Sequence, residues 1–396
     1  MRKTLLVGLL LSTVLVLGFA LAMPAAAQDR WDGADDLPVS PLECPMMDGE
    51  MAETEEPMAM DMPEYDGGQA VGAPDLAGQD IVLVDVPKLV GIGYFAATTL
   101  GEQQAAEELG NVTVTTDAPT EANIDDQIAV IDNYITQGVN GVLFAANDPV
   151  AIAPVLRRAL EAGIHVVGYD ANSEPDAREW FVNQAEFNGI AKAMVDSMVA
   201  EIGDAGSFAI VTSTFTTPNQ ARWIAEMQAY QEKCYPDMNW LETVEAQEDN
   251  QLSFNQASTL LNKYGPDVDG LFAMTSVATP AAAEAVTQAG LCSLDSMSAA
   301  APSAEDTVAV VGLATPNAMK PYVNDSCVKS VVLWNPIDLG YAAVYVMRAV
   351  VDGDFAPGDT EVEAGRLGTL QVVNGSEVLL GPPFIYDIDN INDFDF

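Results

Sequence analysis

Polar side chains with paired donors or acceptors recur where apolar runs of this chain end. Lys88 follows the apolar run 81–86, and Asp170 follows the run 164–169. The full set of such polar candidates is Lys88, Asn147, Asp148, Asp170, Asn219, Gln220 and Asn335. The aromatic residues Tyr169 and Trp334 are interleaved with them. Forked hydrogen bonds can bind neighbouring hydroxyl groups, and an aromatic face can cover the C–H side of a ring, so this mixture suits a sugar.

Several of these residues also have a purely structural interpretation. Asp148 precedes Pro149, an arrangement typical of a helix cap followed by a first-turn proline. Asn219 lies at the start of another expected helix and could cap it. Trp334 could simply pack in a core. The sequence leaves both interpretations open for each residue.

Residues for catalysis are scarce. His165 is the only histidine, and it lies inside an apolar segment. This excludes a multi-histidine metal site and argues against a histidine-based triad. Pairs of carboxylates could serve a glycosidase, but 59 acidic residues do not single out a pair. We therefore predict a protein that is not an enzyme and has no catalytic residue, metal or cofactor.

One motif offers a rival function. Residues 91–96 read Gly-Ile-Gly-Tyr-Phe-Ala, which fits the glycine-rich fingerprint of dinucleotide-binding proteins, and Asp117 lies at a suitable distance for a ribose contact. The alternative is that the glycines allow a loop to approach a ligand or another backbone closely. The expected export of the chain argues against a nicotinamide-dependent oxidoreductase, because such cofactors are largely intracellular.

The elements that must position these residues alternate between strands and helices. From residue 81, short runs that are apolar throughout are followed by helical segments that end at glycine, as at Gly110, Gly138 and Gly163. This order is typical of parallel sheets covered on both faces. A similar order returns after Gly270, which predicts two similar α/β lobes. Because ligands of such sheets bind beyond the carboxyl ends of strands, two lobes facing each other would form a cleft.

Charge limits the partners. The chain has 59 acidic and 15 basic residues, a formal net charge of −44. Nucleic-acid binding needs clustered Lys and Arg, so we expect no nucleic-acid partner. The charge also argues against long-range attraction of an anionic ligand.

The N-terminus has the features of an export signal. Arg2 and Lys3 precede a long apolar run, and small residues at 25–27 predict cleavage before Gln28. The run is long enough that it could instead remain as a membrane anchor. Residues 28–79 are rich in Pro, Met and acidic residues without periodicity, which predicts a disordered linker.

Four cysteines occur at positions 44, 234, 292 and 327. None forms a C-x-x-C pair, and an exported protein meets an oxidising environment, so disulfides are expected. Cys292 and Cys327 both follow expected helices of the second lobe, and we predict that they pair.

Several segments together resemble a known family. Residues 87–95, 183–184, 279–283, 315–322 and 333–334 resemble, in this order, the autoinducer-2-binding and rhamnose-binding branch of the sugar-binding proteins of ABC importers. The resemblance spans residues 80–396. It implies the type I periplasmic-binding-protein fold, in which two α/β lobes are joined by three crossovers that form a hinge.

The resemblance also implies roles for residues. The ligand lysine would be Lys88, the strand-end aspartate Asp170, and the acid–amide pair Asn219-Gln220. Backbone contacts would come from Pro280 and Ala282, and pocket aromatics from Phe95 and Trp334. Two positions depart from the family pattern, because Asn219 and Asn335 are amides where acids are expected. The amides can donate as well as accept, which makes autoinducer-2 itself doubtful and favours a monosaccharide or deoxysugar.

These observations predict an α/β protein with two doubly wound parallel-sheet lobes. We expect lobe 1 to contain residues 80–183 and 335–367, and lobe 2 to contain residues 184–334 and 368–396. We expect a monomer in the periplasm or on the outer face of the membrane, which captures a small sugar and delivers it to an ABC permease. A sensory receptor that presents its ligand to a membrane kinase, or an exported enzyme on the same fold, are the alternatives.

Overall fold

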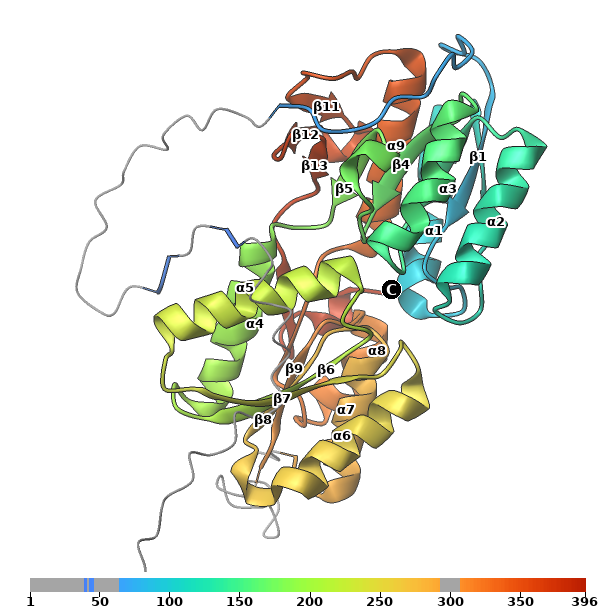
Figure 1. Cartoon of the computed structure of the whole chain (residues 1–396). Coiled ribbons are helices and arrows are strands. Elements are labelled where there is room, and N and C mark those ends of the chain that lie inside the picture. Colours follow the sequence, from blue (N-terminus) through green and yellow to red (C-terminus); the bar gives the residue numbers. More distant parts are fainter. Residues whose placement is uncertain (1–38, 41–42, 46–63, 293–306) are drawn as a thin grey trace, which may run out of the picture.

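The computed structural model describes residues 39–40, 43–45, 64–292 and 307–396, which form two lobes, one above the other in Figure 1. The first lobe contains a sheet in the order β11-β12-β13-β5-β4-β3-β1-β2. Its strands are β1 (Ile81–Val86), β2 (Val112–Thr116), β3 (Gly141–Phe144), β4 (His165–Tyr169), β5 (Trp180–Asn183), β11 (Glu361–Glu363), β12 (Thr369–Val372) and β13 (Glu377–Leu379). Strands β1 to β5 are parallel, as their unbroken apolar runs predict.

Helices cover both faces of this sheet. Helix α1 (Gly93–Leu109) packs against α9 (Pro336–Asp352) on one face, and α2 (Ile124–Gln137) packs against α3 (Pro149–Glu161) on the other. Alternating residues of β1 face the two sides, with Leu83 in one core and Val84 in the other. The dinucleotide-like motif lies where β1 leads into α1, and Gly91 there has a φ of 94°, which suits glycine.

The second lobe repeats this plan on a smaller sheet in the order β7-β6-β8-β9, all parallel. Its strands are β6 (Ser207–Thr212), β7 (Asn239–Glu245), β8 (Gly270–Ala273) and β9 (Ala309–Gly312). Its helices are α4 (Phe187–Ile202), α5 (Pro218–Cys234), α6 (Asn250–Tyr264), α7 (Ala278–Ala289) and α8 (Pro316–Asn324). An antiparallel pair, β10 (Ser330–Leu333) and β14 (Phe384–Asp387), lies beside the end of β9, where Leu313 forms a parallel bridge with Val332. Short 3-10 helices occur at Pro175–Ala177, Gly265–Asp267, Gly365–Leu367 and Ile391–Asp393.

Within the described residues, the chain passes between the lobes three times. The passages lie between β5 and α4, between β10 and α9, and between β13 and β14. The first two agree with the boundaries expected at 183/184 and 334/335. The third differs from the boundary expected at 367/368, because β12 and β13 belong to the sheet of the first lobe, where β13 pairs with β5.

The expected linker does not extend to residue 79. Residues 64–79 lie on the first lobe, where the Tyr65 hydroxyl donates to the Glu179 carbonyl at 2.8 Å and its ring packs edge-on to Trp180. The Arg348 guanidinium donates to the carbonyls of Leu76 and Gln79, each at 2.9 Å. A segment that lacks periodicity is therefore ordered through hydrogen bonds to the lobe that it crosses.

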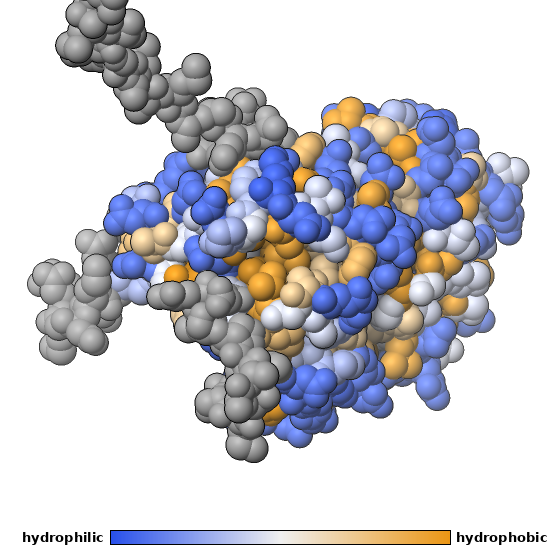
Figure 2. Space-filling model, turned by 90° about the horizontal axis from the view of Figure 1, so that it is seen from below, coloured by the Kyte–Doolittle hydropathy of each residue, from blue (hydrophilic) through white to orange (hydrophobic). Residues whose placement is uncertain are grey.

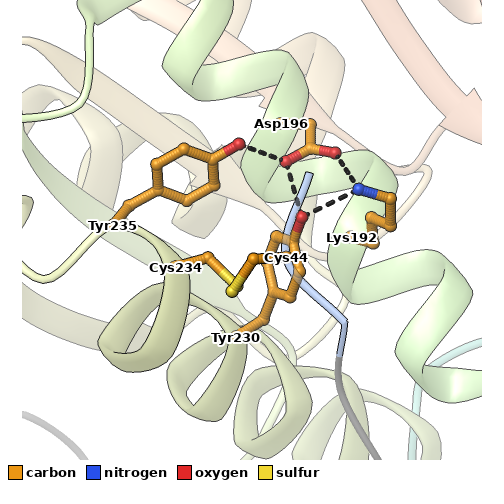
Figure 3. Close-up of a disulfide and its surroundings, with 6 residues drawn as sticks. All are labelled: Cys44, Lys192, Asp196, Tyr230, Cys234 and Tyr235. Carbon is orange, nitrogen blue, oxygen red and sulfur yellow. Dashed lines mark hydrogen bonds and ion pairs between the residues drawn. A yellow bond between two sulfur atoms is a disulfide. The ribbon is translucent and has the colours of Figure 1, made fainter. Parts of the chain in front are cut away.

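Two disulfides fasten the chain. Cys292 is bonded to Cys327, the pairing expected from the sequence. Cys44 is bonded to Cys234 at the end of α5, which attaches the N-terminal segment to the second lobe (Figure 3). Beside this bond, Asp196 accepts hydrogen bonds from Tyr230 and Tyr235 at 2.9 and 2.7 Å.

The expected export signal at 1–27 lies outside the described residues. Among the residues that the structure describes, no helix combines the length and apolar character that a membrane span needs.

Candidate ligand-binding cleft

A cleft lies between the two lobes at the carboxyl ends of β1, β4, β6, β8 and β10. It contains about 350 Å³ of space not filled by atoms, part of it open to solvent. Its lining residues are Lys88, Ile92, Tyr94, Phe95, Asp170, Asn219, Gln220, Trp223, Glu248, Met274, Thr275, Ser276, Leu313, Leu333 and Trp334. The structure therefore brings together six of the residues singled out in the sequence, namely Lys88, Phe95, Asp170, Asn219, Gln220 and Trp334.

A buried ion pair lies on the first-lobe side of the cleft. The Lys88 ammonium lies 3.1 Å from Asp170 Oδ2, and both residues are only 3% exposed. Asp170 has a φ of 59°, a left-handed conformation that the sharp exit from β4 requires. A buried charge needs a partner of opposite sign, and each member of the pair supplies one for the other.

Tyr94 and Trp334 hold Asp170 in place. The Tyr94 hydroxyl donates to Asp170 Oδ1 at 2.9 Å, and Trp334 Nε1 donates to the Tyr94 oxygen at 2.9 Å. Burial, together with the neighbouring Asp170 carboxylate, raises the pKa of Tyr94 well above its usual value. Tyr94 therefore remains protonated and keeps donating to Asp170.

The start of α5 forms the second-lobe side. Asn219 Oδ1 accepts hydrogen bonds from Lys88 Nζ at 3.3 Å, across the cleft, and from the Gln220 backbone N–H at 3.0 Å. Gln220 Oε1 accepts from the Thr212 hydroxyl at 2.6 Å and from the Ser213 N–H at 2.8 Å. The oxygens of both amides are engaged, and Gln220 Nε2 donates one hydrogen to Glu248 Oε1 at 3.2 Å. The Asn219 NH₂ group and the second hydrogen on Gln220 Nε2 are therefore the amide donors available to a ligand.

Aromatic rings form an apolar part of the lining. The ring centroids of Trp223 and Trp334 are 5.6 Å apart, and those of Tyr94 and Phe95 are 5.1 Å apart. Such surfaces can pack against the C–H groups of a sugar ring, while the polar groups of the lining bind its hydroxyls.

Five residues singled out in the sequence do not line the cleft. Asp148 and Asn335 cap helices: Asp148 Oδ1 accepts from the N–H of Ala151 at 2.8 Å, and Asn335 Oδ1 accepts from the N–H of Ile337 at 2.9 Å. Asn147 supports Lys88 from behind, because its Nδ2 donates to the Lys88 carbonyl at 2.9 Å.

Pro280 and Ala282 also lie elsewhere. Pro280 lies within α7 and lines a different hollow beside Phe254, and Ala282 is fully buried. The carboxyl end of β8 is at Ala273, so the residues that enter the cleft are Met274, Thr275 and Ser276. Pro280 and Ala282, the expected backbone contacts to the ligand, therefore lie further along the chain than the residues that enter the cleft.

Other lining residues were not recognised in the sequence. Tyr94 lies inside the glycine-rich motif, and Trp223 follows Asn219 by one helical turn on α5, so helical periodicity would have indicated it. Glu248 lies in the loop after β7, three residues past the end of the strand, so it does not stand out as a strand-end residue in the sequence.

Comparison with known proteins identifies the family. Residues 84–354 match the model of the periplasmic binding protein domain. The chain belongs to the periplasmic binding protein family. The predictions of the fold class and of this family are thereby confirmed. Membership makes the chain a binding protein rather than an enzyme, as predicted, and places its action outside the cytoplasm.

Solved structures agree with this assignment. This binding protein is 31% identical to a sugar ABC transporter protein from Actinomyces odontolyticus, with 82% of this chain and 100% of that chain covered and a TM-score of 0.63. It is 29% identical to an ABC transporter solute-binding protein from Clostridium phytofermentas with bound L-rhamnose, with 80% and 98% covered and a TM-score of 0.70. It also shares the fold of LsrB from Clostridium saccharobutylicum in complex with AI-2, at 24% identity, with 80% and 100% covered and a TM-score of 0.71.

Proposed function

We propose that this periplasmic binding protein captures a small uncharged sugar between its lobes and delivers it to an ABC importer in the membrane. The observation that carries the proposal is the convergence of Lys88 and Asp170 from one lobe with Asn219 and Gln220 from the other. A ligand that binds these groups touches both lobes at once and stabilises the closed arrangement over an open one.

The relatives support a sugar as the ligand. The protein from Clostridium phytofermentas carries L-rhamnose, and the one from Actinomyces odontolyticus is described as part of a sugar transporter. The lining of the cleft combines two indole rings with amide, ammonium and carboxylate groups, which fits a monosaccharide or deoxysugar. The ligand-binding set that we propose is Lys88, Tyr94, Phe95, Asp170, Asn219, Gln220, Trp223 and Trp334.

We also propose that the protein is exported and acts as a monomer. The basic start and apolar run of residues 1–27 suit an export signal, and the acidic composition suits a soluble receptor without a nucleic-acid partner. Figure 2 shows hydrophilic side chains over much of one face of the molecule, with hydrophobic ones between them. Delivery to a permease then places the protein in the periplasm or at the outer face of the membrane.

A thermal-shift screen tests the proposal. Neutral hexoses, 6-deoxyhexoses and pentoses are each added in large excess, and hits are titrated by calorimetry. At a concentration of 100 Kd a bound sugar stabilises the folded state by about 2.7 kcal/mol, so we expect a clear rise in Tm for at least one sugar. Turnover of the hit would contradict a pure binding role, and a panel without any rise in Tm would contradict the sugar assignment.

A further inference from the structure

Glu248 brings a second carboxylate into the cleft, and it comes from the second lobe. It lies in the loop between β7 and α6, where Gln247 and Glu248 both have a positive φ, of 52° and 56°. Non-glycine residues adopt this conformation rarely, so the surrounding contacts must hold it. The Gln247 N–H donates to the Ser213 carbonyl at 2.9 Å, and Asp249 caps α6 through the Leu252 N–H at 2.6 Å. The loop is thus fixed on both sides of Glu248.

The side chain of Glu248 faces the groups already assigned to the ligand. Its Oε1 accepts a hydrogen bond from Gln220 Nε2 at 3.2 Å. Burial raises the pKa of Glu248, the Lys88 charge lowers it, and the Asp170 charge raises it again, which places Glu248 within electrostatic reach of both. The charged groups of the cleft lining are therefore one ammonium, from Lys88, and two carboxylates, from Asp170 and Glu248.

This combination decides which ligand chemistry fits. Ionised carboxylates only accept hydrogen bonds, so they bind hydroxyl groups that donate. With one positive and two negative groups, the lining has a net charge of −1, and a ligand carboxylate or phosphate entering it would lack a free positive partner. Lys88 cannot supply one, because Asp170 already neutralises it at 3.1 Å. A buried like charge without a partner is strongly unfavourable.

We propose that Glu248 binds a hydroxyl group of the ligand and that, together with Asp170, it makes the cleft select neutral sugars over sugar acids. The inference rests on the proposed function, since it specifies how the same cleft discriminates among sugars. Glu248 is then a specificity-determining residue contributed by the second lobe.

Calorimetric titration of three proteins tests this inference: the wild type, Glu248→Gln and Gln247→Ala. Glu248→Gln removes the charge and keeps the shape. Gln247→Ala is the matched control, because Gln247 is exposed, neighbours Glu248 and has the same backbone conformation. Each protein is titrated with the neutral sugar that binds the wild type best, and with the corresponding sugar acid, in which the terminal carbon is a carboxylate.

We expect Glu248→Gln to weaken binding of the neutral sugar about tenfold or more, because a charge-assisted hydrogen bond is lost. We expect Gln247→Ala to stay within twofold of the wild type. The ratio of the two Kd values, sugar acid over neutral sugar, should fall in Glu248→Gln, an effect that a merely structural role would not produce.

Other outcomes distinguish a failure of the role of Glu248 from a failure of the proposed function. If the wild type binds a neutral sugar and Glu248→Gln binds it equally well, or if both variants lose affinity alike, the role of Glu248 is refuted and the proposed function stands. Tighter binding of the sugar acid than of the neutral sugar by the wild type would also refute it. A wild type that binds no sugar overturns the proposed function, and with it this inference.

Discussion

At the scale of residues, the Lys88–Asp170 pair is the centre of the cleft. Lys88 follows β1 and Asp170 follows β4, the two strands that flank β3, so one edge of a parallel sheet brings the two opposite charges together. Asp170 is positioned in turn by Tyr94, which Trp334 supports. The polar atoms of the pair are therefore preorganised before a ligand arrives.

Replacing Asp170 should weaken ligand binding specifically. In Asp170→Ala a charged acceptor is lost and Lys88 is left without its counter-charge, so we expect the affinity for the sugar to fall by about 1.5–3 kcal/mol. Calorimetric titration measures this loss. Asp148→Ala is the matched control, because Asp148 caps α3 outside the cleft and should cost about 0.5–2 kcal/mol of stability but no affinity. Equal losses of affinity in both variants would contradict the assignment of the site.

The sequence predicted part of this site, and the misses have a physical reason. Lys88, Asp170, Asn219 and Gln220 were found because they lie where a strand ends or a helix begins. Asp148 and Asn335 carry the same signal, yet their side chains turn back onto their own helices as caps. Which of the two directions a side chain takes depends on its rotamer and neighbours, and local sequence does not determine these.

At the scale of elements, β1, α1 and β4 enclose two buried acids beneath the cleft. Asp85 on β1 and Glu102 on α1 are both fully buried, and the Tyr169 hydroxyl of β4 donates to Asp85 Oδ1 at 2.9 Å. Burial raises the pKa of both carboxyl groups, and the charge of Asp85 raises that of Glu102 further. The folded protein therefore keeps a proton on this pair at a pH where the unfolded chain has lost it.

The pair should make stability depend on pH. Because the folded state binds more protons than the unfolded state above about pH 4, the contribution of the pair to stability declines as the pH rises toward the raised values. Glu102→Gln removes one titrating group, so its stability should decline less. Urea unfolding at pH 5 and pH 8 measures this, and we expect the free energy of unfolding to fall less between the two pH values in Glu102→Gln than in the wild type.

Glu107→Gln is the control for this measurement, since Glu107 is an exposed acid on the same helix. Its free energy of unfolding should change between the two pH values by as much as that of the wild type. If the free energy of unfolding of Glu102→Gln also changes by as much as that of the wild type, the buried pair does not make stability depend on pH in this range.

The order of the main strands and helices could be predicted from the sequence, whereas the short C-terminal strands and the end of the linker could not. The local sequence alone predicts β1, β3, β6 and β8, which are apolar runs, and the helix ends, which are glycines. It does not predict the short strands β11, β12 and β13 or the segment 64–79, because contacts with the first lobe hold them in place. This is why the predicted linker was too long and the third passage between the lobes was placed too early.

At the scale of the whole molecule, hydrogen bonds connect the two lobes directly. Lys88 Nζ of the first lobe donates to Asn219 Oδ1 of the second lobe at 3.3 Å, and Trp334, at the passage between the lobes, donates to Tyr94 at 2.9 Å. The three passages within the described residues limit how the lobes can move relative to one another. A ligand that replaces the contact between Lys88 and Asn219 would connect the lobes through its own hydroxyl groups.

A crystal structure of the protein with the sugar that binds best is the most direct test of this account. We predict that the sugar lies between the lobes, with hydroxyl groups within hydrogen-bond distance of Lys88, Asp170 and Gln220 and one face of its ring against Trp223 or Trp334. A sugar bound outside this cleft, or one that touches a single lobe, would contradict it.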